Sequence, residues 1–207
     1  MKIFILGATG ATGLQLTGQA VNAGHQVTVY VRNPDKLGEL KNKVNVVEGE
    51  LTDEQKILKA LVGQEAILST LGYKKLKDKS LFVRRTIVAV IKGMEQYHIP
   101  KLVYESANII GGKDSVSKPF LKLVLKTFGL LNPFIDHFET EKVIRQSNVD
   151  WTIARPGNLT KGKLRGEYHA AEKLKGLSKI SRADVAHFML DALTNKKWSR
   201  KAIEIGY

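Results

Sequence analysis

Residues 1–13 read MKIFILGATGATG, and this stretch decides the fold. Its apolar run, Ile3 to Leu6, is typical of a strand buried on both faces in a parallel sheet. Three glycines spaced three residues apart follow the run, and an amphipathic helical pattern begins at once. A strand, a glycine turn and a helix in direct succession predict a dinucleotide-binding unit, although a plain strand-to-helix turn gives the same order.

Each glycine has a physical task in such a unit. Gly7 permits the tight turn out of the strand, Gly10 lets a pyrophosphate approach the backbone, and Gly13 lets the helix pack close to the sheet. The unpaired N–H groups and the positive dipole end of the helix would face the phosphates. Thr9 and Thr12 add hydroxyl donors. The predicted phosphate-binding residues are Gly7, Thr9, Gly10, Ala11, Thr12 and Gly13.

The end of the second predicted strand, Gln26 to Val31, indicates which dinucleotide binds. An acidic residue there usually binds the ribose 2′-hydroxyl of NAD, whereas a basic residue accommodates the 2′-phosphate of NADP. Arg32 occupies this position, and Lys36 adds a second positive charge nearby. Because a guanidinium can contact a phosphate through two parallel hydrogen bonds, the sequence predicts NADP(H) in preference to NAD(H).

Strand and helix patterns alternate along the rest of the chain. Further strands are predicted at 43–47, 65–68, 101–105, 151–154 and 202–205, and helices at 11–23, 53–61, 79–97, 132–147 and 181–193. This alternation predicts an α/β fold of the Rossmann type, with a doubly wound, mainly parallel sheet flanked by helices and a small C-terminal substrate region. No linker divides the chain, so residues 1–207 are expected to form a single domain.

Ligands of doubly wound sheets lie beyond the carboxyl ends of the strands. Glu50 and Leu51, after the third strand, are therefore candidates for an adenine pocket. Glu50 is equally consistent with an acidic loop residue near the start of a helix, with no role in ligand binding. Thr70, Leu71 and Gly72, after the fourth strand, are expected beside the ribose of the cofactor.

Composition narrows the class of protein. The chain has 33 Lys and Arg against 20 Asp and Glu, a net charge of +13, and a calculated pI of about 9.8. This charge attracts anions of many kinds, but no recognition-helix pattern or aromatic interleaving accompanies it. A solvated, lysine-rich surface is the simpler interpretation, and nucleic-acid binding is disfavoured.

The absence of cysteine excludes disulfides, cysteine nucleophiles and thiolate metal sites. The five histidines show no metal-ligand spacing, so no metal site is predicted. No apolar run reaches the ~20 residues of a membrane span, and no signal-peptide pattern opens the chain. We therefore expect a cytoplasmic protein.

One apolar segment remains ambiguous. Residues 116–131 are mostly apolar, and lysines at 118, 122 and 126 share one helical face. The segment, and Leu121–Leu131 within it, fits a surface helix, a lid over the substrate or a helix at a membrane interface.

Taken together, six motifs resemble a known family. They are GATGATG at 7–13, VR at 31–32, VVEGE at 46–50, LG at 71–72, WTIARPGN at 151–158 and ISRADVA at 180–186. With them, nearly the whole chain resembles the atypical short-chain dehydrogenase/reductases of the NAD(P)H-binding group. That group includes the flavin and biliverdin-IXβ reductases and the NmrA-like proteins. The resemblance implies the fold and the cofactor, and it leaves the substrate open.

The resemblance also implies catalytic residues, with one departure. Short-chain dehydrogenases activate the substrate carbonyl through a Tyr-x-x-x-Lys motif, but the corresponding residues here are Phe138 and Lys142, so the tyrosine hydroxyl is absent. By position in the family, Ser106 lies near the nicotinamide, and His137 flanks the pocket. The same resemblance implies that Pro156 and Gly157 shape the nicotinamide site. The neighbouring cofactor-binding candidate Asn158 stands where the flavin-reductase branch has histidine, so a possible proton donor is absent.

Three functions are compatible with these residues. The leading hypothesis is an NADPH-dependent reductase of a flat, conjugated small-molecule acceptor such as a flavin or a quinone. The second is a non-catalytic NADP(H) sensor that regulates a partner protein, which Phe138 favours. The third is an epimerase or dehydratase of a small metabolite, which Phe138 disfavours. A monomer or a homodimer fits each of them.

Overall fold

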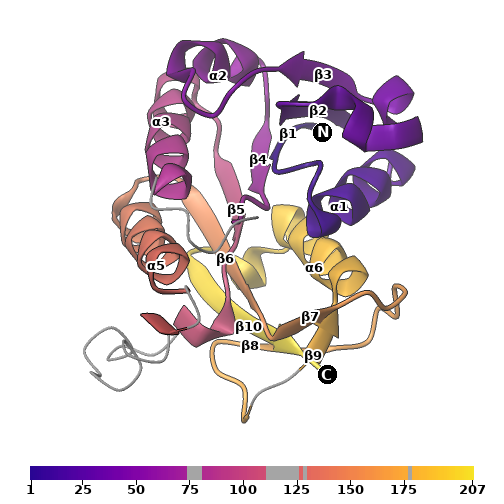
Figure 1. The fold of residues 1–207 in the computed structure, drawn as a ribbon, viewed down its shortest axis with the longest axis vertical. Helices are drawn as coiled ribbons and strands as arrows, with labels where there is room; N and C mark the ends of the chain where they lie inside the picture. Colours follow the sequence, from indigo (N-terminus) through magenta and orange to yellow (C-terminus); the bar gives the residue numbers. More distant parts are fainter. Residues whose placement is uncertain (74–80, 111–125, 128–129, 177–178) are drawn as a thin grey trace.

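A computed structural model of the protein describes residues 1–73, 81–110, 126–127, 130–176 and 179–207 (Figure 1). Its centre is an eight-stranded sheet with the order β3-β2-β1-β4-β5-β6-β10-β8, beside a two-stranded sheet of β7 and β9. The strands are β1 (Lys2–Leu6), β2 (Gln26–Val31), β3 (Asn45–Glu48), β4 (Ala66–Ser69), β5 (Lys101–Glu105), β6 (Asp150–Pro156), β7 (Asn158–Thr160), β8 (His169–Ala171), β9 (Lys179–Ser181) and β10 (Lys201–Gly206).

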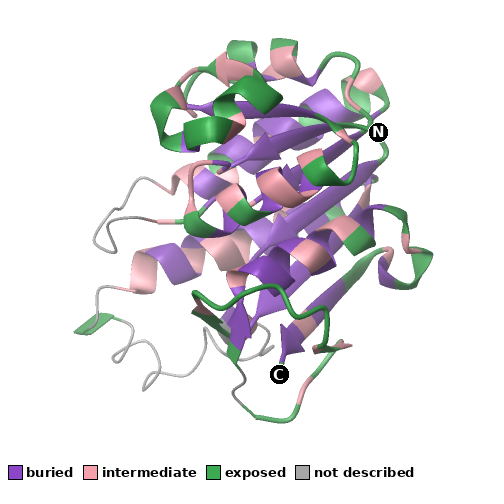
Figure 2. Cartoon of the chain, turned by 90° about the vertical axis from the view of Figure 1, so that its right-hand side faces the viewer, coloured by how far each residue is buried: buried purple, intermediate pink, exposed green. Residues whose placement is uncertain are grey.

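Helices cover both faces of the large sheet. The described helices are α1 (Ala11–Asn22), α2 (Glu54–Leu61), α3 (Phe82–Tyr97), α5 (Leu131–Gln146) and α6 (Arg182–Thr194), with 3₁₀ turns η1 (Pro34–Lys43), η2 (Asn108–Ile110) and η3 (Lys196–Trp198). Helices α1 and α6 pack together in one core cluster, whereas α2, α3 and α5 belong to a second cluster. Figure 2 shows the buried strands between these layers.

The apolar run of β1 is divided between the two cores. Ile3 and Ile5 pack in the cluster of α1 and α6, and Phe4 and Leu6 pack in the cluster of α2, α3 and α5. All four side chains are fully buried. A strand covered by helices on both faces has no polar side to show, which explains the continuous apolar pattern.

The topology creates the crevice in which such folds bind ligands. β1 pairs in parallel with both β2 and β4, so the chain winds outward to β3 and then returns to the other side of β1. The remaining pairs of the large sheet are parallel too, except that β8 runs antiparallel to β10. The prediction of a doubly wound, mainly parallel Rossmann-type sheet is confirmed, and the carboxyl ends of β1 and β4 mark its switch point.

The sequence patterns predicted the long elements to within three residues but missed the short ones. β7, β8 and β9 have three residues each, and most of their side chains are at least partly exposed, so no apolar alternation announced them. The ambiguous apolar segment lies outside the described residues, apart from 126–127 and 130–131. No helix within the described ranges is long and apolar enough to cross a membrane.

Candidate functional site

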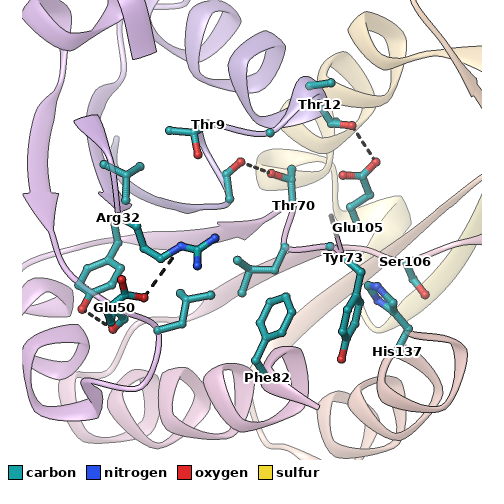
Figure 3. Close-up of a pocket in the computed structure, with 18 of the residues that line it drawn as sticks. Thr9, Thr12, Arg32, Glu50, Thr70, Tyr73, Phe82, Glu105, Ser106 and His137 are labelled. Atoms are coloured by element: carbon teal, nitrogen blue, oxygen red, sulfur yellow. Dashed lines mark hydrogen bonds and ion pairs between the residues drawn. The ribbon is translucent and has the colours of Figure 1, made fainter. Parts of the chain in front are cut away.

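A cavity of about 860 Å³ opens at the carboxyl ends of β1, β2, β4 and β5 (Figure 3). Most of the residues predicted to bind the cofactor contribute to its wall, although they come from separate parts of the chain. Those that line it are Gly7, Thr9, Gly10, Ala11, Thr12, Arg32, Glu50, Leu51, Thr70, Leu71, Gly72, Ser106 and His137. The predicted switch-point crevice is thus a cavity lined by these residues.

The glycine loop is packed so closely that side chains would not fit. Gly7 has a φ of +79°, and a Cβ there would lie 2.6 Å from the carbonyl oxygen of Thr70. The N–H of Gly10 donates to the carbonyl of Gly7 at 2.8 Å. A Cβ on Gly13 would lie only 2.1 Å from that same Gly7 oxygen. Gly13 therefore lies beneath the loop and supports it, while Gly7 and Gly10 form the cavity wall.

Neither the N-cap residue nor the first turn of α1 supplies an acidic side chain to the free N–H groups at the helix start. Gly10 is the N-cap, so no side chain accepts a hydrogen bond from the first N–H groups, and no acidic residue lies in that turn. These N–H groups and the positive end of the helix dipole point to the glycine side of the cavity. This is the arrangement that binds phosphate groups in other proteins.

A second end of the cavity forms where β2 and β3 stop. The hydroxyl of Tyr30 donates to the carbonyl of Glu50 at 2.9 Å, and a Cβ on Gly49 would lie 2.2 Å from that hydroxyl oxygen. Gly49 thus lets the loop lie directly on the tyrosine. Arg32 reaches Glu50 at 3.9 Å, with its side chain 60% exposed. So weak a pair leaves the guanidinium available to another anion.

Ser106 is held by a buried ion pair below the opposite end of the cavity. Its hydroxyl donates to Glu141 at 2.7 Å, and Glu141 also accepts from Arg155 through two hydrogen bonds, one of them 3.0 Å long. Glu141 is 3% exposed and Arg155 is 9% exposed. Since the paired carboxylate can only accept, the Ser106 proton is committed to it, and toward any other group the serine oxygen can act only as an acceptor.

His137 completes this end together with two aromatic rings. Its Nδ1 is hydrogen-bonded to the hydroxyl of Tyr104, and burial lowers the pKa of His137 and raises the pKa of Tyr104. The ring of Tyr73 lies 4.7 Å from that of Phe82 and 6.3 Å from the imidazole, measured between centroids. A neutral histidine and two aromatic rings therefore share one wall of the cavity (Figure 3).

A buried carboxylate holds this aromatic wall together. Asp136, from α5, accepts from the Tyr73 hydroxyl at 2.5 Å and from the backbone N–H groups of Val83 and Arg84 at 2.9 and 3.1 Å. The last two bonds cap the N-terminus of α3, whose own N-cap residue, Leu81, has no side-chain acceptor. The wall is thus fixed by a contact between two helices far apart in sequence.

Two charged residues of the cavity were missed by the sequence analysis. Glu105 ends β5 and is 8% exposed, and it accepts a hydrogen bond from Thr12 at 3.1 Å. Burial raises the pKa of Glu105 to about 7, which Thr12 and the positive charge of Arg182 partly oppose. Arg182 is the first residue of α6 and also lines the cavity. The rule that ligands lie at carboxyl strand ends would have found Glu105.

The structure does not bring several predicted residues to the described cavity wall. Lys142 pairs with Glu139 at 2.8 Å and lies over the Phe138 ring, 4.8 Å from its centroid. Lys36 is exposed on η1, and Asn158 is exposed at the start of β7. Pro156 and Gly157 are buried at the end of β6. Pro156 is still paired with Ile205 in the sheet, and from this part of the chain Leu159 of β7 lines the cavity.

Metal-ligand chemistry has no counterpart in the part of the chain that is described. No group of three or more His, Asp or Glu side chains there is arranged to hold an ion. Of the charged residues that line the cavity, Arg32 pairs weakly with Glu50, and Glu105 accepts a hydrogen bond from Thr12.

Comparison with known proteins gives a family. The family described as NAD(P)H-binding matches residues 7–196. Among curated proteins, an uncharacterized chloroplastic protein of Arabidopsis thaliana, At2g34460, is 26% identical over 99% of this chain and 76% of its own length.

Solved structures agree on the fold. A short-chain dehydrogenase/reductase of Veillonella parvula, crystallised with NADP, has a TM-score of 0.80 at 19% identity, covering 100% of this chain and 94% of the other. ChuY, an anaerobillin reductase of Escherichia coli O157:H7, has a TM-score of 0.81 at 20% identity, with 100% and 97% covered. At these identities the likeness establishes a shared fold.

Proposed function

The chain belongs to the NAD(P)H-binding family of reductase-like Rossmann proteins, and from this premise we propose that it is an NADPH-dependent reductase of a flat, conjugated acceptor such as a flavin or a quinone. One observation carries the proposal. A single cavity joins the glycine loop of α1 to a wall made of Tyr73, Phe82 and His137. A hydride donor held at the first end and a flat ring held at the second would meet inside it.

The glycine end fits a dinucleotide diphosphate. A Cβ at Gly7 or Gly13 would clash with neighbouring backbone atoms, so the loop keeps its shape only with glycine there. The N–H groups of the first turn of α1 have no side-chain acceptor from the N-cap residue. Arg32 would hold the 2′-phosphate, and the loop at Glu50 and Leu51 would receive the adenine. Residues 70–72 would lie along the ribose. The bound cofactor supplies the hydride, which no side chain of the protein can provide.

The residues at the other end bind and orient the acceptor. Tyr73, Phe82 and Leu159 offer an apolar surface for a planar ring. His137 is neutral, and when Tyr104 donates to its Nδ1, the hydrogen on Nε2 is free to bond a carbonyl or ring nitrogen of the acceptor. Ser106 accepts from an N–H or O–H of the same ring. Phe138 has no hydroxyl, so proton transfer of the Tyr-x-x-x-Lys type is not part of this reaction.

Steady-state oxidation of NADPH with a panel of flavins and quinones tests the proposal. We expect turnover with at least one acceptor. His137→Gln should lower kcat for it at least tenfold and leave the NADPH dissociation constant within about twofold. His169→Gln, an exposed histidine on β8, serves as the matched control. Tight binding of NADPH with no turnover of any acceptor would contradict the reductase assignment.

That last result would select the second candidate, a non-catalytic NADP(H) sensor. It is favoured by one observation, the phenylalanine at position 138, whose ring stacks on Phe134 at 6.4 Å and takes part in packing. A sensor would bind the cofactor and a partner protein without consuming NADPH. Affinity purification with and without NADPH, followed by identification of a co-purifying protein, separates the two functions.

A further inference from the structure

The carboxyl group of Glu105 has no task in the function proposed above, yet Glu105 lines the cavity beside the first turn of α1. It extends from the end of β5 toward Thr12 in the first turn of α1 (Figure 3). The Thr12 hydroxyl donates to one of its oxygens at 3.1 Å. Thr12 is itself the second residue of α1, so the carboxyl is hydrogen-bonded directly to the helix end that would carry a bound diphosphate.

The groups around Glu105 leave its charge largely uncompensated. From α6, Arg182 acts at a distance without forming an ion pair with it in the described part of the chain. From β6, Arg155 is occupied by Glu141 of α5, and from α5, His137 is neutral. Within β5 itself, Tyr104 stays protonated because burial and nearby carboxylates raise its pKa. A negative charge placed against α1 would therefore act on Glu105 with little screening.

Resting on the proposed function, we propose that Glu105 takes up a proton when the dinucleotide binds, so that its neutral carboxyl is part of the cofactor site. A diphosphate carries two negative charges, and like charges in a buried site disfavour the ionised carboxylate. The neutral group removes this repulsion and retains the Thr12 hydrogen bond. In the free protein burial already raises the pKa of Glu105 to about 7, so a modest further increase protonates it near neutral pH.

Two other groups of the complex titrate nearby and must be separated from Glu105. The 2′-phosphate of NADPH has a pKa of about 6, and contact with Arg32 would drive protons off it, the opposite sign. NADH lacks this phosphate and shares the diphosphate, so it isolates the Glu105 effect. His137 can gain a proton when an anion binds, and the variant His137→Gln removes that contribution.

Calorimetric titration with NADH at pH 7.5, in buffers of different ionisation enthalpy, measures the protons taken up. Because a carboxyl with a pKa of about 7 is already about a quarter protonated at pH 7.5, we expect an uptake of roughly 0.5 to 0.75 proton for the wild type and for His137→Gln, and none for Glu105→Gln. The wild-type dissociation constant should rise by up to about tenfold per pH unit above 7, and that of Glu105→Gln should stay flat. Glu95→Gln, an exposed residue of α3, makes the same charge change away from the cavity and should behave as the wild type.

The outcomes distinguish a failure of the proposed function from a failure of the role proposed for Glu105. Failure of both NADH and NADPH to bind at any pH would remove the proposed function itself. Binding of NADH without proton uptake, or uptake that persists in Glu105→Gln, would overturn the role of Glu105 and leave the proposed function standing. If Glu105→Gln does not fold, the buffer dependence and the pH dependence of the wild type and His137→Gln decide the question.

Discussion

The two ends of the cavity are built in different ways. The glycine end is made mainly of backbone held by close approach: Gly7 packs against Thr70, and the loop at Gly49 packs on Tyr30. The opposite end is made of side chains from distant residues, such as Ser106 with Glu141 and Tyr104 with His137. The glycine end should therefore be sensitive to added volume, and the acceptor end to lost charge or lost hydrogen bonds.

The sharpest way to break the glycine end is Gly13→Ala. The added Cβ would lie 2.1 Å from the Gly7 carbonyl oxygen, a backbone atom that can move only with the whole loop. We expect the free energy of unfolding to fall by about 4 kcal/mol or more, or NADPH binding to weaken over 100-fold if the loop yields instead. Urea unfolding and NADPH titration measure the two effects.

The same helix contains its own control for this prediction. In Gly18→Ala the new Cβ would meet only Leu40, at an ordinary 3.9 Å. Removing a glycine from the helix interior should then stabilise the protein by up to about 1 kcal/mol. Similar behaviour of the two variants would mean that close packing is not what distinguishes the glycine loop.

The counterpart at the acceptor end is Arg155→Met. This change removes the guanidinium, and among the described residues it leaves the buried Glu141 with Arg145, 3.5 Å away, and Ser106 as partners. We expect a loss of about 3 kcal/mol in the free energy of unfolding, because an incompletely compensated charge stays in the interior. Glu139→Gln, which breaks the partly exposed pair with Lys142 on the same helix, should cost less than about 1 kcal/mol. Equal losses would show that burial of the pair is unimportant.

The same contrast explains what the sequence could predict. Short motifs at the ends of the first four strands contain the glycine loop, Arg32 and the residues after β3 and β4. The structure gathers these residues in one cavity. Arg182 was missed because α6 meets the carboxyl ends of the central strands only in the folded chain, whereas Glu105 could have been found as the last residue of the predicted strand 101–105. Lys142 was placed in the site by analogy with Tyr-x-x-x-Lys, but its charge is turned to Glu139 on the helix surface.

The boundary between the two ends is Glu105, and its stability effect depends on pH. A carboxyl whose pKa is raised from 4.5 to about 7 by burial binds a proton in the folded state that the unfolded chain has lost. The folded protein is therefore destabilised as pH rises from about 4.5 to 7, and the cost persists above 7. Glu105→Gln should raise the free energy of unfolding by up to about 3 kcal/mol at pH 8 and by little at pH 4.5.

Denaturant unfolding of the wild type and Glu105→Gln at both pH values gives this difference directly. Glu95→Gln again controls for the loss of one negative charge from a strongly basic protein. A gain from Glu105→Gln that is equal at pH 4.5 and pH 8 would mean that the carboxyl does not titrate in this range.

The smallest expected effect concerns which dinucleotide the glycine end prefers. Arg32 is mostly exposed and only weakly paired with Glu50, so Arg32→Ala should hardly change stability. Because a charged hydrogen bond to a phosphate contributes about 1.5–3 kcal/mol, we expect NADPH to bind about 10- to 100-fold more weakly while NADH changes less than about threefold. Fluorescence titration with both nucleotides measures the ratio. Glu50→Gln, which frees the guanidinium, should slightly increase the preference for NADPH over NADH. Equal losses of NADPH and NADH affinity in Arg32→Ala would mean that another cation binds the 2′-phosphate.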